Sequence, residues 1–151
     1  MKTFTAAKSE IVERMRKLSP DAKAQWGRMS AHQMVCHLAD SYRLAMGECH
    51  GSDKSNFFTK TVMKFGALRI PLQWPKGVPT VPELDQVAGA GTQPAIFEAD
   101  HARLLQLFER FAATPRDFTF GRHPMFVEMS EWEWMRWAYL HADHHLRQFG
   151  V

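Results

Sequence analysis

The stretch SEWEWMRWAYLHADHHLRQ, residues 130–148, decides the fold because it predicts one long amphipathic helix. Ser130 and Glu133 have the spacing of a capping box, in which each side chain bonds a backbone amide at the start of a helix. One face of that helix is formed by positions 134, 137, 138, 141, 145 and 148, which are Trp134, Trp137, Ala138, His141, His145 and Gln148. The face begins with tryptophans and continues into histidines, so we expect it to be buried.

The histidines of this stretch have the spacing of metal ligands. His141 and His145 are neighbours on one helix face, and His144, three residues after His141, competes with His145 on spacing alone. A third imidazole from another helix would complete a three-nitrogen site with open coordination positions, which is typical of catalytic metals. Each buried imidazole needs a donor and an acceptor partner, and coordination to one cation satisfies all three together.

The third histidine is expected in a helix predicted over residues 31–46. Ser30 and Gln33 form a second capping box, and Gly47 is a stop signal. His37 falls on the apolar stripe of this helix and therefore faces inward. A lone inward histidine is more often a hydrogen-bonded core residue than a ligand, but the pair downstream favours a shared site. Asp40 follows one turn later as a supporting candidate.

Two further helices complete an all-α pattern. Residues 9–18 carry apolar side chains at helical spacing before Ser19 and Pro20, and another helix follows Pro94 and ends before Pro115. Its expected apolar face comprises Ile96, Phe97, Leu104, Leu105, Leu107, Phe108 and Phe111. The connection 48–93 is rich in proline and contains one apolar segment, 57–68, that predicts a shorter helix. We expect one domain over residues 1–151, an antiparallel-type four-helix bundle with this connection packed over one end.

Composition narrows the class of protein. A chain of 151 residues suits one domain, and Cys36 and Cys49 fit neither a CxxC pair nor a disulfide framework, which indicates a reducing compartment. Cys36 is expected to be buried. Because the chain lacks an apolar leader and a run of about eighteen apolar residues, we expect a cytoplasmic protein without a membrane partner. The 19 basic and 16 acidic residues are spread along the chain, so no nucleic-acid partner is expected.

The sequence excludes two more specific metal-binding motifs, that of metalloprotease helices and that of di-iron bundles. Metalloprotease helices need Glu after the first histidine, where this chain has Ala142. Di-iron bundles need two Glu-x-x-His pairs, and the only such pair is Glu98 with His101. The remaining histidines are expected at the surface, in caps or in loops, with His123 in a linker that overhangs the site; they are His32, His50, His101 and His123.

Three segments carry a resemblance to a known family. Residues 29–41 (MSAHQMVCHLADS), 123–126 (HPMF) and 134–150 resemble the DinB/YfiT-like metalloenzyme superfamily, and in particular a bacterial branch without an established function. Members are four-helix bundles that bind a divalent metal through one histidine of the second helix and a His-x-x-x-His pair of the fourth. The resemblance therefore implies that the ligands are His37, His141 and His145. Val127 follows HPMF, where relatives often have glycine.

The resemblance implies several chemistries. Relatives include transferases and isomerases that use low-molecular-weight thiols, and proteins described only as metal-dependent hydrolases. A cation on three neutral imidazoles can lower the pKa of bound water from about 15.7 to about 7, or hold a thiol as the thiolate. We expect a thiol transferase with a small-molecule substrate and with zinc or nickel as the metal. The alternatives are a hydrolase that uses metal-bound hydroxide, and a non-catalytic metal- or small-molecule-binding module.

Several other residues are expected near the metal. Trp134, Trp137, Phe57 and Phe58 are predicted to wall an apolar pocket, while His123 and His144 are candidates for the pocket or for contacts that support the ligands. Asp143 lies between the ligands in sequence but points to another face of the helix. The high apolar content also leads us to expect a homodimer.

Overall fold

The computed structural model describes residues 4–151, in which the chain forms five α-helices and no β-strand. The helices are α1 (Phe4–Lys17), α2 (Ala31–Ala45), α3 (Lys64–Arg69), α4 (Phe97–Ala112) and α5 (Glu131–Gln148). The all-α prediction is confirmed for this part of the chain. None of its helices combines the length and the apolar character needed to span a bilayer.

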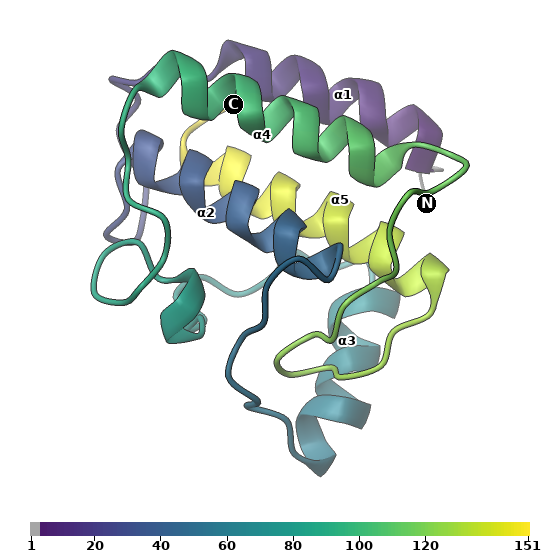
Figure 1. The fold of residues 1–151 in the computed structure, drawn as a ribbon. Helices are drawn as coiled ribbons and strands as arrows, with labels where there is room; N and C mark the ends of the chain where they lie inside the picture. Colours follow the sequence, from purple (N-terminus) through teal and green to yellow (C-terminus); the bar gives the residue numbers. More distant parts are fainter. Residues whose placement is uncertain (1–3) are drawn as a thin grey trace.

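Four long helices pack together in two layers. Figure 1 shows α1 beside α4 in one layer and α2 beside α5 in the other, with α2 packed on α4 and α1 on α5. The neighbours α1 and α4 run in opposite directions, as do α2 and α5, so the antiparallel prediction holds for these two pairs. It does not hold for α1 with α5 or for α2 with α4, which run in the same direction, because the connection 46–96 returns along the bundle before α4 begins.

The capping boxes set the starts of α2 and α5. The amide of Gln33 donates to Ser30 Oγ (3.1 Å), while the amide of Ser30 donates to the Gln33 side chain (2.9 Å). The corresponding bonds at the start of α5 join Ser130 and Glu133. Both predicted starts are confirmed. α1 begins at Phe4, five residues before the predicted start at residue 9. The prediction was too short because the apolar period that marks this helix is not visible in residues 4–8.

The core forms where the four long helices meet. Its largest fully buried side chains include Tyr42, Phe108, Phe111 and Trp134. Cys36 is buried, as predicted. Ile96 is 64% exposed, so the prediction that it belongs to the apolar face of α4 is wrong: it precedes the helix as its N-cap residue and does not share the face.

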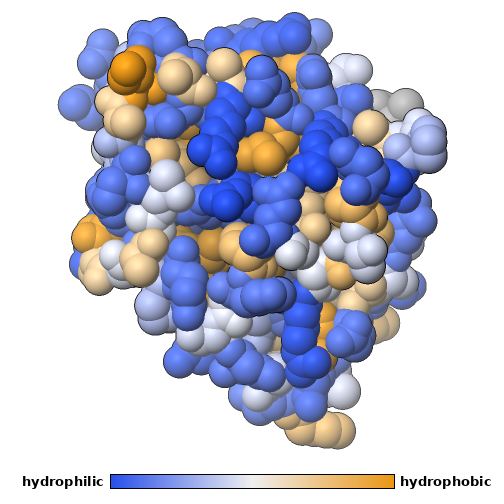
Figure 2. Space-filling model, viewed as in Figure 1, coloured by the Kyte–Doolittle hydropathy of each residue, from blue (hydrophilic) through white to orange (hydrophobic). Residues whose placement is uncertain are grey.

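The connection contains more local structure than predicted. The expected short helix is a π-helical turn, Thr59–Met63, followed by α3, and a 3-10 turn at Pro82–Leu84 was not expected. Phe57 is 80% exposed and Phe58 58% exposed, so the prediction that they wall the pocket is wrong. Both residues lie at the start of the helical segment 57–69, which projects below the bundle in Figure 1. Elsewhere on this view of the molecule, polar side chains predominate and apolar ones are scattered (Figure 2).

A tight turn precedes α5. His123 and Val127 exchange backbone hydrogen bonds of 3.1 and 2.9 Å, which closes the turn. Val127 has φ 63°, in the left-handed region that is unfavourable for a β-branched residue. Glycine would adopt this conformation without the steric cost that Val127 bears.

Candidate metal centre

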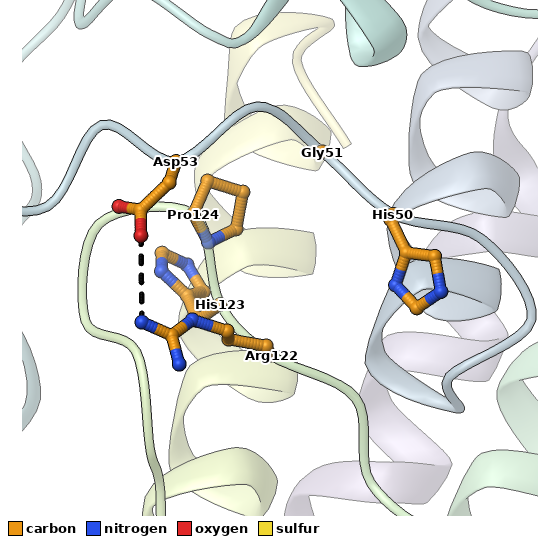
Figure 3. Close-up of a pocket in the computed structure, with 6 residues that line it drawn as sticks. All are labelled: His50, Gly51, Asp53, Arg122, His123 and Pro124. Carbon is orange, nitrogen blue, oxygen red and sulfur yellow. Dashed lines mark hydrogen bonds and ion pairs between the residues drawn. The ribbon is translucent and has the colours of Figure 1, made fainter.

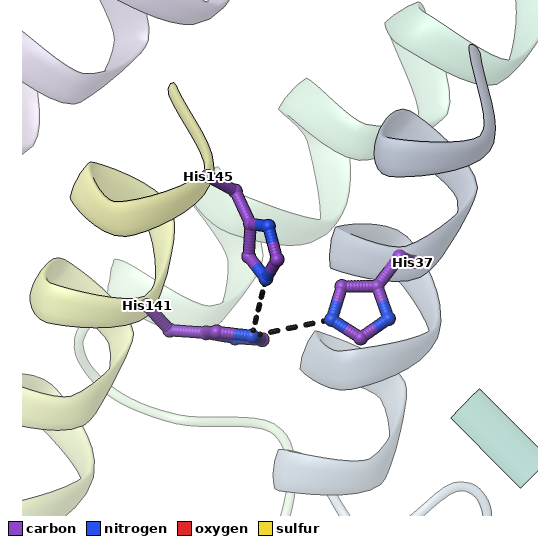
Figure 4. Close-up of side chains that lie close together, drawn as sticks. All are labelled: His37, His141 and His145. Carbon is purple, nitrogen blue, oxygen red and sulfur yellow. Dashed lines mark hydrogen bonds between the residues drawn. The ribbon is translucent and has the colours of Figure 1, made fainter. Parts of the chain in front are cut away.

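Three histidines converge between α2 and α5. His37 projects from α2, and His141 and His145 project from α5 toward it (Figure 4). His141 Nε2 lies 3.3 Å from His37 Nε2 and 3.2 Å from His145 Nε2. His37 and His145 are buried, while His141 is partly exposed and forms the edge of the cluster.

The spacing of the three nitrogens fits one metal ion. Imidazole nitrogens bind zinc at about 2.0–2.1 Å, so two ligands of a tetrahedral site lie about 3.3–3.4 Å apart. The two distances from His141 Nε2, 3.3 and 3.2 Å, agree with this separation, and all three ligand atoms lie within 4.8 Å of one another. The cluster could therefore hold an ion after only a small adjustment of the side chains.

The proton of His37 is fixed on its outer nitrogen. His37 Nδ1 lies 2.7 Å from the carbonyl oxygen of Leu84. A carbonyl oxygen only accepts, so Nδ1 carries the hydrogen and donates. In the neutral ring, Nε2 therefore presents a lone pair toward the other two histidines.

Gln148 fixes His145 in the same way. The Gln148 Nε2 amide donates to the carbonyl oxygen of Trp26 (2.7 Å), which turns Gln148 Oε1 toward His145 Nδ1 (2.9 Å). Because this oxygen only accepts, His145 Nδ1 carries the hydrogen. His145 Nε2 is then a second lone pair at the centre of the cluster.

His141 cannot satisfy both lone pairs. A neutral imidazole has one hydrogen, so His141 Nε2 can donate to His37 or to His145, while the other contact stays without a hydrogen. Its Nδ1 is buried and has no partner within residues 4–151. Burial lowers the pKa of all three rings, and positive charge on neighbouring histidines lowers that of His141 further, so the doubly protonated form is disfavoured. A cation would satisfy the three nitrogens together.

Aromatic rings surround the partly exposed side of the cluster. The Trp137 ring lies 4.9 Å from the His141 ring, and the Trp74 ring lies 6.1 Å from it. His144 does not join the three nitrogens; its ring lies 5.7 Å from Trp26 and 6.3 Å from Trp74. The structure therefore brings His145, rather than His144, to the cluster.

Comparison with known proteins places the chain in a family. A family model described as "Protein of unknown function (DUF1569)" matches residues 3–150. The chain belongs to the DUF1569 family. No curated protein and no solved structure matches the chain. The resemblance of this DUF1569 protein to the DinB/YfiT-like superfamily stays a prediction.

Two carboxylates of the DUF1569 protein lie near the cluster in sequence but bind other groups. Asp40 is buried and accepts hydrogen bonds of 2.8 Å each from the Gln86 side chain, the Thr92 amide and the Thr92 hydroxyl. Asp143 pairs with Arg14 (2.7 Å) and Arg147 (2.9 Å). Asp40 thus anchors the connection to α2, and Asp143 joins α5 to α1.

Two other predicted site residues lie farther from the cluster. Trp134 is fully buried and contacts Trp137 and His123 rather than the three ligand candidates. His123 is also buried, and its Nδ1 accepts hydrogen bonds from the amides of Met125 and Phe126. Burial lowers the pKa of His123 to about 3. The expectation of an overhanging loop histidine is therefore wrong, because the turn at 123–127 folds this ring into the protein.

His123 lines a pocket separate from the cluster. This pocket of about 130 Å³ is lined by His50, Gly51, Asp53, Arg122, His123 and Pro124, as Figure 3 shows. Arg122 and Asp53 form an ion pair of 3.4 Å across it. None of the three clustered histidines lines this pocket.

His32, Cys36 and Asp100 form a second group of residues of the types that bind metals, but their hydrogen bonds give them a structural role. His32 Nε2 lies 2.7 Å from Asp100 Oδ2, which also accepts the Ala95 amide at the start of α4. Cys36 lies beside them, and burial together with Asp100 raises the pKa of its thiol to about 11. These contacts join α2 to α4 and keep the thiol protonated.

The sequence prediction missed the groups that orient the histidines. The Leu84 carbonyl and the rings of Trp26 and Trp74 belong to segments without helical periodicity, so no pattern placed them near α5. Gln148 did carry a signal: it follows His145 by three residues on the same stripe, which is the spacing of neighbouring helical side chains.

Proposed function

We propose that this DUF1569 protein binds one divalent transition-metal ion through the Nε2 atoms of His37, His141 and His145. The observation that carries the proposal is that His141 Nε2 lies 3.3 Å from His37 Nε2 and 3.2 Å from His145 Nε2, with the hydrogens of His37 and His145 held on their Nδ1 atoms. Hydrogen bonding within the cluster leaves one contact between lone pairs. Zinc and nickel are the expected ions, because both suit imidazole ligands.

The protein's own groups prepare the site for this ion. Leu84 and Gln148 hold two imidazoles in the tautomer that a metal requires, and Trp137 covers the ring of the third. A bound divalent cation would supply Lewis acidity, which lowers the pKa of a thiol or water at its open positions. Such a molecule is expected to approach past His141, the member of the cluster that is partly exposed.

We further propose that the reaction transfers a low-molecular-weight thiol to an electrophilic small molecule. The thiol sulfur forms a bond to an electrophilic carbon, the bond from that carbon to its leaving group breaks, and the thiol proton passes to the leaving group or to solvent. The engagement of Asp40 and Asp143 supports this choice over ester or amide hydrolysis, because hydrolysis also calls for a nearby group that passes a proton to the leaving group. A metal-held thiolate that displaces a halide requires no such group.

A substrate screen tests the transferase. Protein loaded with zinc or nickel is given low-molecular-weight thiols with alkyl halides or epoxides, and separately esters and amides without a thiol. We expect turnover that requires both thiol and metal, is lost in His141→Ala and is retained in His50→Ala, which changes an exposed histidine outside the cluster. Ester or amide hydrolysis without a thiol, or stoichiometric uptake without turnover, would overturn the transferase.

A further inference from the structure

The groups that support the three histidines are electrically neutral. His37 donates to a backbone carbonyl and His145 to a side-chain amide, while His141 Nδ1 has no partner in the described part of the chain. A carboxylate in these positions would add negative charge to the ligand set. Without one, an ion held by three neutral imidazoles keeps its full double positive charge, and the site as a whole favours a negatively charged ligand.

Positive charges lie on the side of the cluster where His144 packs, whereas the carboxylates of Asp40 and Asp85 act on His37. Asp143, the acidic residue acting on neighbouring His144, is already paired with Arg14 and Arg147. Lys76 and Arg147 both act on His144 as positive charges, while Asp40 and Asp85 already accept hydrogen bonds from groups outside the cluster. The Lys76 ammonium lies 4.4 Å from the centre of the Trp26 ring, at the side of the cluster where His144 packs.

Flat apolar surfaces lie on the same side. Trp74 contacts the rings of His141 and His144, Trp26 contacts the ring of His144, and both tryptophans are partly exposed. His141 is the member of the cluster at the exposed edge. A molecule that reaches the centre past His141 therefore meets the Trp74 ring. The Trp26 ring and the Lys76 ammonium lie farther along the same side.

We infer that the molecule that completes the metal site is a monoanion on a flat apolar body. Its thiolate or carboxylate occupies the open coordination position, and its body packs against Trp74. This inference deepens the proposed function and rests on it, because the anion needs the ion.

Absorption titration of the cobalt(II)-loaded protein tests this substrate class, since cobalt reports ligand binding directly. The matched probes are acetate with benzoate, and 2-mercaptoethanol with benzyl mercaptan; pyridine supplies a flat ring without charge. We expect benzoate to bind at least about tenfold more tightly than pyridine. The affinity for each aromatic anion should be about two- to tenfold higher than that for its aliphatic partner. The carboxylate and thiol pairs show which donor the site prefers.

Two variants assign the preference to this surface. Trp74→Leu should reduce the benzoate-to-acetate ratio of affinities toward one. Lys76→Glu should lower the affinity for acetate and for benzoate by about two- to tenfold. Lys60→Glu, the same change at another exposed lysine, should leave both affinities unchanged.

The outcomes separate the two proposals. Failure to take up cobalt refutes the proposed metal site itself. If cobalt binds, equal affinity for pyridine and benzoate, or an unchanged benzoate-to-acetate ratio in Trp74→Leu, overturns the inferred substrate class.

Discussion

Replacing Gln148 tests whether the hydrogen bond to His145 prepares this ring for a metal. In Gln148→Leu the side chain keeps its approximate size but loses the bonds to His145 Nδ1 (2.9 Å) and to the Trp26 carbonyl (2.7 Å). Each buried group left without a partner costs about 1–3 kcal/mol. His145 also becomes free to carry its hydrogen on Nε2, and in that tautomer the nitrogen that faces the cluster cannot bind a metal.

We expect zinc affinity to fall about 10- to 100-fold, which is the usual effect of losing a group that supports a metal-bound histidine. This corresponds to about 1.4–2.7 kcal/mol. Competition with a chromophoric chelator measures the affinity. Gln93→Leu is the control for losing a glutamine amide, because this amide donates two hydrogen bonds to carbonyl oxygens but contacts no histidine of the cluster. A folded Gln148→Leu protein with zinc affinity within about twofold of the unchanged protein would refute the reasoning.

Three further predictions concern stability. Trp134→Ala should lower the free energy of unfolding in urea by about 3–5 kcal/mol, because it empties a fully buried site; a loss below about 1 kcal/mol would contradict the assigned core. The pKa of His123 is about 3 in the folded protein and about 6.5 when unfolded, so its contribution is complete above pH 6.5 and is lost as pH falls toward 3. His123→Asn should therefore flatten the fall in unfolding free energy across this range, and an identical pH profile would oppose the assignment. Val127→Gly should raise the unfolding free energy by about 1 kcal/mol by relieving φ 63°, whereas a large decrease would show that the side chain outweighs the strain.

The sequence predicted the long helices well because their signals are local. Two capping boxes and an apolar period placed α2 and α5 within a residue of their ends, and the same period turned His37 and His141 toward each other. α1 was predicted too short, since its first residues carry no such period.

The connection shows what periodicity cannot predict. Phe57 and Phe58 were assigned to a pocket because they are apolar, but the projecting segment leaves them in solvent. The Leu84 carbonyl reaches His37 through a turn whose position depends on contacts distant in sequence, including the three hydrogen bonds to Asp40. Such long-range contacts also bring Trp74 to His141, and no spacing rule within one segment encodes them.

The metal content of protein purified without an affinity tag tests the central claim most directly. Elemental analysis should find about one divalent transition-metal ion per chain in the unchanged protein and in His50→Ala. It should find almost none in His37→Ala, His141→Ala or His145→Ala, provided that circular dichroism shows these variants to be folded. Full metal content in the folded triad variants, or no uptake by the unchanged protein after incubation with zinc or nickel, would contradict the metal centre.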